Sequence, residues 1–238
     1  SESMTEFLLA QFGLGVADLY RVEGPVNLVR LMQVPDCVDH PDLKFSAFTP
    51  GVPKAVGKGI NIFDSIRRSD ILLHHPYQSF APVIEFLNQA ALDPQVVAIK
   101  MTVYRTGTDS VLMQSLIRAA QNGKEVTVVV ELMARFDEEA NIGWATKLEE
   151  VGAHVVYGVV GYKTHLKALL IVRREEGGLK RYAHLGTGNY HPRTARLYSD
   201  FGLMTANEEI TFDVSEVFKQ LTGLGKARTL KHLWQAPF

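Results

Sequence analysis

Apolar positions change their spacing along this chain and divide it into segments. Apolar residues recur at helical spacing over 4–12, and a second short helix is predicted over 25–32, with proline near its start. Residues 34–59 then hold four prolines and three glycines, a density of breakers typical of a connection. We therefore expect a short N-terminal helical segment and a linker that ends near residue 55.

A regular alternation of helical and strand patterns follows. A short helix is predicted over 61–68 and an apolar strand at 71–73. Helices are then predicted over 80–92, 109–121 and 138–151, and strands over 96–104, 126–133 and 155–160. Asp109 is the expected N-cap of the second of these helices, which Asn122 and Gly123 end. This succession predicts a largely parallel sheet with right-handed crossovers.

The pattern changes after residue 160. Strands are predicted over 165–173 and 179–185, and Glu175-Glu176-Gly177-Gly178 between them is a hairpin signal. A strand over 201–205, a helix over 208–221 and an unfinished helical pattern over 226–234 complete the chain. The predicted fold class is α/β, with a mixed, mostly parallel sheet flanked by helices on both faces.

Composition fits a globular protein of ordinary type. Of 238 residues, 46% are hydrophobic and 21% charged, and no apolar run approaches the roughly 20 residues of a membrane helix. The N-terminus does not resemble a signal peptide, and the single Cys37 excludes an internal disulfide framework. We expect a cytoplasmic protein. Because the chain begins without Met, we also expect it to be a piece of something longer.

Charge is distributed unevenly along the chain. The net charge of −1 argues against a general polyanion-binding surface, so no nucleic-acid partner is expected. Residues 161–200, however, hold eight Lys or Arg against three acids, which makes this stretch +5 and the remainder −6. The basic residues are Lys163, Lys167, Arg173, Arg174, Lys180, Arg181, Arg193 and Arg196. An anion site and solvated charges on hairpin edges explain this stretch equally well.

The most informative residues flank the predicted hairpin. On a strand, His165 and Lys167 project to the same face. The hairpin returns the turn Gly186-Thr187-Gly188-Asn189 to their side. Its two glycines let backbone N–H groups approach an anion, and Thr187 and Asn189 add polar side chains.

Two arginines point to the same place. Arg105 and Arg135 follow two predicted parallel strands and so lie at the carboxyl edge of the sheet, where open α/β sheets bind ligands. A histidine beside guanidinium, ammonium and backbone donors suits phosphoryl transfer, because the cations stabilise charge on the transferring group. Each feature alone has an ordinary structural explanation, and their shared edge is what favours a site.

Longer strings resemble the polyphosphate kinase family. They lie at 70–77 (DILLHHPY), 100–105 (KMTVYR), 131–141 (ELMARFDEEAN), 163–167 (KTHLK) and 184–190 (HLGTGNY), and the resemblance runs from about residue 16 to the end. His165-x-Lys167 with its glycine turn also resembles the phospholipase D motif. The acid that this motif has five positions after the lysine is Val172 here. This departure counts against a phosphodiesterase and fits polyphosphate kinase.

The resemblance implies a role for each matching residue. His165 is the expected phosphohistidine nucleophile, Lys167 contacts the transferring phosphoryl group, and Tyr198 contacts ATP. Arg105 and Arg135 are expected on phosphate or magnesium-phosphate, since a cationic guanidinium cannot ligate Mg²⁺ itself. The implied cofactors are Mg²⁺ and ATP as a substrate, and the implied partners are ATP or ADP and inorganic polyphosphate.

The resemblance also implies a domain layout. Residues 1–55 resemble the end of a head domain and a linker, 56–224 the first phospholipase D-like catalytic domain, and 225–238 the connection to a second. No second His-x-Lys string with a matching turn follows Gly223. We therefore expect half of an active site, weak activity alone, and a homo-oligomeric parent whose membrane association stays open. A non-catalytic phosphate- or polyphosphate-binding module and a phospholipase D-type phosphodiesterase are the alternatives.

Overall fold

The computed structural model describes residues 1–104, 107, 109–131, 138–159, 161–224 and 228–236. The chain divides into two units, Ser1–Phe48 and Thr49–Phe238. The first unit holds α1 (Glu2–Phe12), α2 (Val34–Cys37) and 3-10 turns at Val16–Asp18, Leu28–Gln33 and Pro41–Leu43. No side chain within 1–48 is buried. The helix predicted over 25–32 is instead the second of these turns, which begins three residues later and runs directly into α2.

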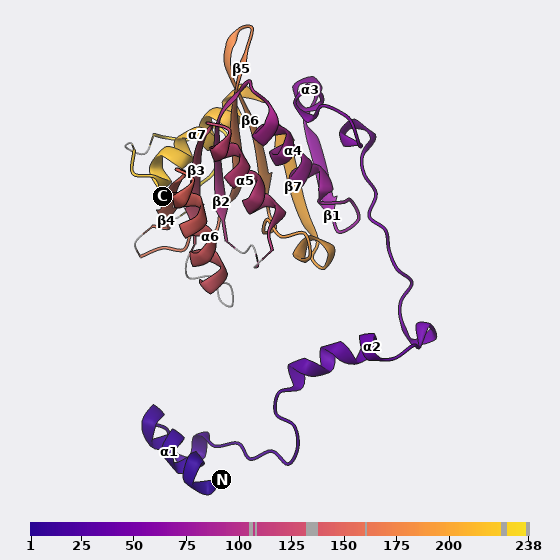
Figure 1. The fold of residues 1–238 in the computed structure, drawn as a ribbon, viewed down its shortest axis with the longest axis vertical. Coiled ribbons are helices and arrows are strands. Elements are labelled where there is room, and N and C mark those ends of the chain that lie inside the picture. The colour runs from indigo at the N-terminus through magenta and orange to yellow at the C-terminus, as the bar shows by residue number, and fades with distance from the viewer. Residues whose placement is uncertain (105–106, 108, 132–137, 160, 225–227, 237–238) are drawn as a thin grey trace. The chain divides into compact units, whose positions relative to one another are not determined.

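The second unit is built on a seven-stranded mixed sheet in the order β1-β7-β6-β5-β2-β3-β4 (Figure 1). The strands are β1 (Ile71–His75), β2 (Val96–Val103), β3 (Glu125–Val130), β4 (His154–Tyr157), β5 (Lys167–Glu175), β6 (Gly178–Gly186) and β7 (Asp200–Thr205). The predicted mixed sheet is confirmed. Its pairing is less parallel than expected: only β2-β3-β4 pair in parallel. The β5–β6 hairpin and the returns of β7 and β1 make the other four pairings antiparallel.

Helices cover both faces of this sheet. They are α3 (Ile62–Arg68), α4 (Ala81–Leu92), α5 (Val111–Gln121), α6 (Glu138–Glu150) and α7 (Glu208–Leu221), and a 3-10 turn spans Lys54–Val56. Alternation along β5 sends Leu169 and Ile171 into the larger core and Leu170 into a smaller core. Phe218 of α7 belongs to that smaller core. None of the helices that the structure describes is long and apolar enough to cross a bilayer.

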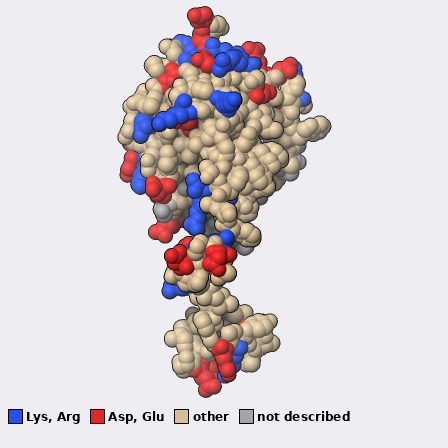
Figure 2. Space-filling view, turned by 90° about the vertical axis from the view of Figure 1, so that its right-hand side faces the viewer, with Lys and Arg blue, Asp and Glu red and all other residues tan. Residues whose placement is uncertain are grey.

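The basic stretch noted in the sequence is divided by the hairpin. Lys167 begins β5, whereas Arg173, Arg174 and Lys180 lie near the turn at Glu176-Gly177, about 20 Å away along a strand of this rise. At the end of the unit that carries this turn, basic and acidic side chains are mixed (Figure 2). Eight neighbouring charges in the sequence therefore do not form one anion-binding surface.

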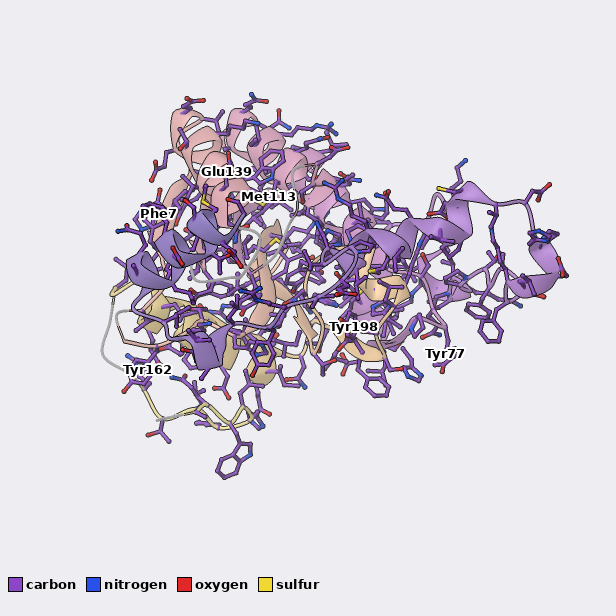
Figure 3. The ribbon with its side chains drawn as sticks, turned by 90° about the horizontal axis from the view of Figure 1, so that it is seen from below. Phe7, Tyr77, Met113, Glu139, Tyr162 and Tyr198 are labelled. Atoms are coloured by element: carbon purple, nitrogen blue, oxygen red, sulfur yellow. The ribbon has the colours of Figure 1, made fainter. Side chains whose placement is uncertain are left out.

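The predicted N-cap of α5 needs correction. Ser110, not Asp109, caps α5, and its hydroxyl accepts the N–H of Met113 (labelled in Figure 3) at 3.4 Å. Asp109 instead accepts from the Gln114 side chain at 3.1 Å. The one-residue shift arises because both residues are good caps, and burial of Ser110 decides between them.

The C-terminal segment is not helical over 228–236, the part of it that the structure describes. Asp213 of α7 explains this difference from the sequence pattern. Its Oδ2 atom accepts the backbone N–H groups of Lys231, His232 and Leu233 at 2.9, 2.6 and 3.0 Å. Although burial opposes it, these hydrogen bonds lower the pKa of Asp213. Three N–H groups that converge on one oxygen fix a non-helical backbone.

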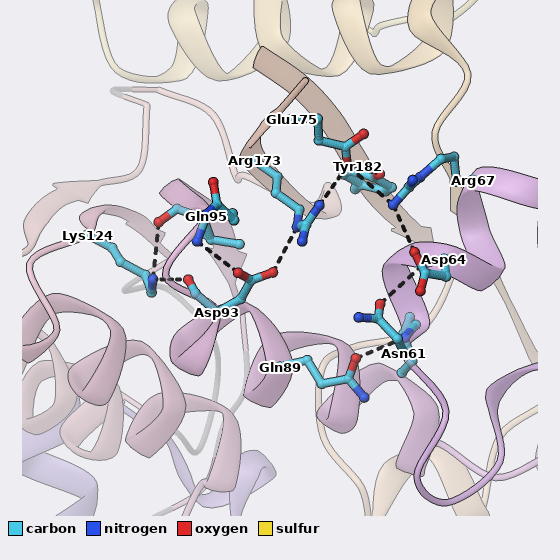
Figure 4. A network of polar contacts seen from close by, with 12 residues as sticks. Asn61, Asp64, Arg67, Gln89, Asp93, Gln95, Lys124, Arg173, Glu175 and Tyr182 are labelled. Carbon is cyan, nitrogen blue, oxygen red and sulfur yellow. Dashed lines mark hydrogen bonds and ion pairs between the residues drawn. The ribbon is translucent and has the colours of Figure 1, made fainter. Parts of the chain in front are cut away.

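A polar network closes the end of the sheet that carries the hairpin turn (Figure 4). Arg173 donates from Nε to Asp93 at 2.8 Å and from a terminal nitrogen to Glu175 at 3.1 Å. Glu175 also accepts from Tyr182, and burial, followed by that hydrogen bond, raises the pKa of Tyr182 to about 12. Because Arg173 joins the loop before β2 to the hairpin, this network supports the sheet far from any candidate site.

Candidate functional site

Several strand ends meet at one edge of the sheet. β2 and β3 end there because they are parallel, and β6 ends there because two antiparallel pairings restore its direction. β5 and β7 begin at this edge, where Lys167 pairs with Gly186 and Gly186 with Gly202. The convergence expected from the sequence is therefore present for the described residues. Arg105 and Arg135 lie outside the residues that the structure describes.

His165 lies in the loop before β5 and not on the strand itself. The N–H of Thr164 donates to Glu131 Oε2 at 2.7 Å, so the chain does not join the strand ladder there. The exposed imidazole contacts the Tyr104 ring edge-on, with centroids 5.4 Å apart. The Lys167 ammonium lies 5.1 Å from the same ring and donates to the His165 carbonyl. Tyr104, and not a shared strand face, brings the two residues together.

The surroundings of His165 and Lys167 lower the pKa of both groups. Partial burial, and then the Lys167 charge, lower the pKa of His165 below its ordinary value. Burial lowers the pKa of Lys167 to about 8, and the Asp200 carboxylate opposes this shift. Near pH 7 the imidazole is therefore largely neutral while the ammonium is still charged. A neutral nucleophile beside a retained positive charge is what attack on a phosphate requires.

The turn after β6 is held against Asp200. The Thr187 hydroxyl donates to Asp200 Oδ1 at 2.8 Å and accepts the Phe201 N–H at 2.9 Å. A Cβ at Gly188 would lie 2.4 Å from Asp200 Oδ2, so only glycine fits there. The Thr187 hydroxyl and the Thr187 N–H, which donates to the Phe201 carbonyl at 2.9 Å, are thus both engaged within the fold. The candidate donors of the turn to an anion are therefore the backbone N–H groups of Gly188 and Asn189.

A cleft of about 650 Å³ opens beside this edge. His165, Lys167 and Gly186 line one side of it, while Leu221 of α7 and Leu233 line another. Tyr198, labelled in Figure 3, is 61% exposed in the loop before β7. The lining of the cleft therefore includes both basic side chains and apolar side chains.

Two further histidines lie close to the turn. The buried His184 shares a 2.8 Å hydrogen bond between Nδ1 and the Tyr190 hydroxyl. Burial, and then the neighbouring His75, lower the pKa of His184 to about 3, so it stays neutral. His191 Nδ1 accepts the Thr194 N–H at 3.3 Å. Both histidines have local structural partners, as their positions beside a glycine turn indicate.

Sequence reasoning assigned no role to four residues at this edge, namely Tyr104, Glu131, Asn141 and Asp200. Three of them occur inside the recognised strings, but their contacts are with residues 10 to 61 positions away. A signal was present for two. Glu131 is an acid directly after a buried strand, and Asp200 is an acid at the first position of a strand that begins at the same edge.

The fold of the second unit is phospholipase D-like. The structure of a phospholipase D family member, Nuc from Salmonella typhimurium, matches with a TM-score of 0.51 over 67% of this chain and 97% of that chain. The two sequences are 17% identical, so this likeness concerns the fold alone.

Comparison of the sequence is more specific. Residues 61–227 match the family described as polyphosphate kinase C-terminal domain 1. A polyphosphate kinase of Burkholderia multivorans is 66% identical over 235 residues, 97% of this chain, and one of Neisseria meningitidis is 64% identical over 233 residues, 98% of it. The crystal structure of polyphosphate kinase from Porphyromonas gingivalis matches with a TM-score of 0.74 at 36% identity, over 90% of this chain and 36% of that chain. The chain belongs to the polyphosphate kinase family, as its motifs predicted. It spans about a third of the length of these relatives, 34% of each of the first two.

Proposed function

We propose that this chain supplies His165 as the phosphate acceptor in reversible transfer of the terminal phosphate of ATP to polyphosphate. The observation that carries the proposal is an exposed imidazole whose pKa is lowered, set beside the charged Lys167 and the Gly186–Asn189 turn. Membership of a family whose relatives are named polyphosphate kinase supports the same reaction.

The proposed transfer has two steps. A nitrogen of neutral His165 attacks the terminal phosphorus of ATP; an N–P bond forms, the bridging P–O bond breaks, and ADP leaves. A terminal oxygen of polyphosphate then attacks the phosphohistidine, which lengthens the chain by one phosphate and restores the imidazole. Lys167 and the backbone N–H groups of Gly188 and Asn189 stabilise negative charge on the transferring group in both steps.

Mg²⁺ enters this proposal bound to phosphate. Among the residues that the structure describes, no group of three His, Cys, Asp or Glu side chains could hold a metal ion. Mg²⁺ commonly keeps several waters and is bound through substrate phosphates, which fits such a site. Arg105 and Arg135 are proposed to bind the phosphate oxygens beside the ion. The exposed ring of Tyr198 is proposed to contact the nucleotide.

Labelling tests the nucleophile directly. A complete polyphosphate kinase that contains this segment is incubated with ATP labelled in its terminal phosphate, and acid-labile label on the protein is counted. We expect His165→Ala to abolish the label. His154→Ala, which alters an exposed histidine at the start of β4, is the matched control and should label normally. Acid-labile label that persists on His165→Ala would overturn the proposal.

The chain alone is proposed to turn over weakly, because it spans only a third of the length of its relatives. The parent protein is proposed to be cytoplasmic and homo-oligomeric. The partial span also favours one alternative, a module that binds phosphate or polyphosphate without catalysis. Calorimetric binding of polyphosphate without any labelling of His165 would favour this module. Hydrolysis of bis(p-nitrophenyl) phosphate would instead revive a phosphodiesterase.

A further inference from the structure

Asn141 of α6 joins the ends of two strands at the site edge. Its side chain is fully buried, and its Nδ2 atom donates to the carbonyl of Tyr104 at 3.0 Å and to that of Glu131 at 3.1 Å. Tyr104 directly follows β2, and Glu131 directly follows β3. One amide group therefore fixes the two backbones that lead into the segments of Arg105 and Arg135.

Glu131 extends this connection to the nucleophile. Its backbone N–H donates to the Val103 carbonyl at 2.9 Å, and its side-chain Oε2 accepts the N–H of Thr164 at 2.7 Å. Glu131 and Thr164 are only 3% and 8% exposed. Because Thr164 directly precedes His165, a buried hydrogen bond fixes the backbone from which the imidazole projects.

A second contact from α6 reaches the same region. Trp144 lies one turn after Asn141, on the same face of the helix, and its Nε1–H donates to the Gly107 carbonyl at 2.9 Å. Gly107 follows Tyr104 by three residues, so α6 fixes the backbone on both sides of Arg105. The helix thus holds two loops of the site, the one after β2 and the one after β3, through side chains that are themselves buried.

We propose that Glu131 and Asn141 are positioning residues for His165. Neither has been placed on the substrate; each acts through the backbone it holds. Asn141 sets the position of Glu131, and Glu131 sets the position of Thr164 and hence of the nucleophile. A misplacement of about 1 Å can lower a rate by about 100-fold. Loss of the Asn141–Glu131 or the Glu131–Thr164 hydrogen bond should therefore slow transfer, because His165 would move. This role rests on the proposed phosphohistidine at His165.

The acceptor on Glu131 can be removed without a change in volume. Glu131→Gln keeps a side-chain oxygen for the Thr164 N–H, whereas Glu131→Met has similar size and no such acceptor. In a complete kinase, we expect Glu131→Met to slow phosphohistidine formation at saturating ATP about 30-fold while KM for ATP changes less than about twofold. Glu131→Gln should recover the rate to within about threefold. Glu139→Met, at an exposed position of α6 labelled in Figure 3, is the matched control and should be unchanged.

Amide exchange reads the hydrogen bond without any activity. In the 238-residue chain, Glu131→Met should raise the exchange rate of the Thr164 N–H about 100-fold, and Glu131→Gln should not. Where Glu131→Met fails a thermal-unfolding check, Asn141→Leu replaces it in both measurements. This variant keeps the Glu131 side chain but removes the amide donor that positions the Glu131 backbone. Rates of Glu131→Met, or of Asn141→Leu in its place, equal to those of Glu139→Met overturn the positioning role. Label that persists on His165→Ala is a separate result, which overturns the proposed function and leaves the exchange measurement to judge the hydrogen bond.

Discussion

Lys167 is the residue whose environment has the clearest consequence for pH dependence. Burial lowers its pKa to about 8, and partial burial together with the Lys167 charge lowers that of His165 below 6.5. Transfer needs a neutral imidazole and a charged ammonium at the same time. The first condition is lost as pH falls through the lowered pKa of His165, and the second is lost as pH rises through the Lys167 pKa of about 8.

The rate of phosphohistidine formation should therefore follow a bell-shaped pH profile, with an acid limb below pH 6.5 and an alkaline limb near 8. Lys167→Met should lower the rate about 100-fold, abolish the alkaline limb and move the acid limb up toward 6.5. The profile is measured by rapid quench in a complete kinase. Lys163→Met, at an exposed position of the same loop, should keep both limbs. An acid limb that stays in place without Lys167 would contradict this account.

Among the glycines that the structure describes, Gly188 has the least space for an added Cβ. A Cβ there would lie 2.4 Å from Asp200 Oδ2, and Asp200 also accepts a hydrogen bond from the Thr187 hydroxyl. We expect Gly188→Ala to lower the free energy of unfolding by about 1–3 kcal/mol, because the turn must move away from Asp200. Gly177→Ala, with nothing within 4 Å of the new Cβ, is its control. Equal urea midpoints for the two variants would show that the turn yields without cost.

Among the elements, the hairpin depends most on polar contacts. Arg173 of β5 pairs with Asp93 and Glu175, and its side chain is only 18% exposed. Arg173→Met leaves both carboxylates without this partner and should destabilise the chain by about 2 kcal/mol. Arg67 provides the comparison: it pairs with Asp64 at 2.8 Å and lies 3.7 Å from Glu175, but its side chain is 43% exposed. Arg67→Met should change stability by less than about 1 kcal/mol, and urea unfolding of both variants tests the difference.

How well each element follows from the sequence depends on where its hydrogen bonds go. The boundaries of α7 follow fully from the pattern, and those of β2 within one residue, because local spacing and burial agree there. His165 and Leu166 also read as strand, yet they lie before β5, and Thr164 next to them donates to Glu131, 33 residues earlier. The C-terminal segment reads as helix, yet its N–H groups converge on Asp213. A side-chain acceptor distant in sequence leaves no trace in the spacing of apolar residues.

For the candidate site, the sequence indicated the chemistry better than the geometry. The hairpin register follows from its turn, so the approach of Gly186 to Lys167 was predictable. Tyr104 as the ring shared by His165 and Lys167 was not, because its contacts depend on how a loop folds back. The role of Asn141 was not predictable either, because an asparagine inside a helical pattern is ordinarily a surface residue.

At the scale of the whole molecule, the question is which charges a polyanion meets. Arg174 and Lys180 lie near the hairpin turn, and Lys163 and Lys167 lie at the other end of the hairpin, beside the cleft. If polyphosphate binds at the cleft, Lys163→Ala/Lys167→Ala should weaken its binding to the chain by roughly tenfold, because two ammonium–phosphate contacts are lost. Arg174→Ala/Lys180→Ala removes the same net charge and should weaken binding by less than about twofold. Calorimetry at two salt concentrations measures both, and the effect of salt on affinity should shrink only in the Lys163/Lys167 variant. Equal losses in the two variants would mean that polyphosphate responds to net charge and not to the site edge.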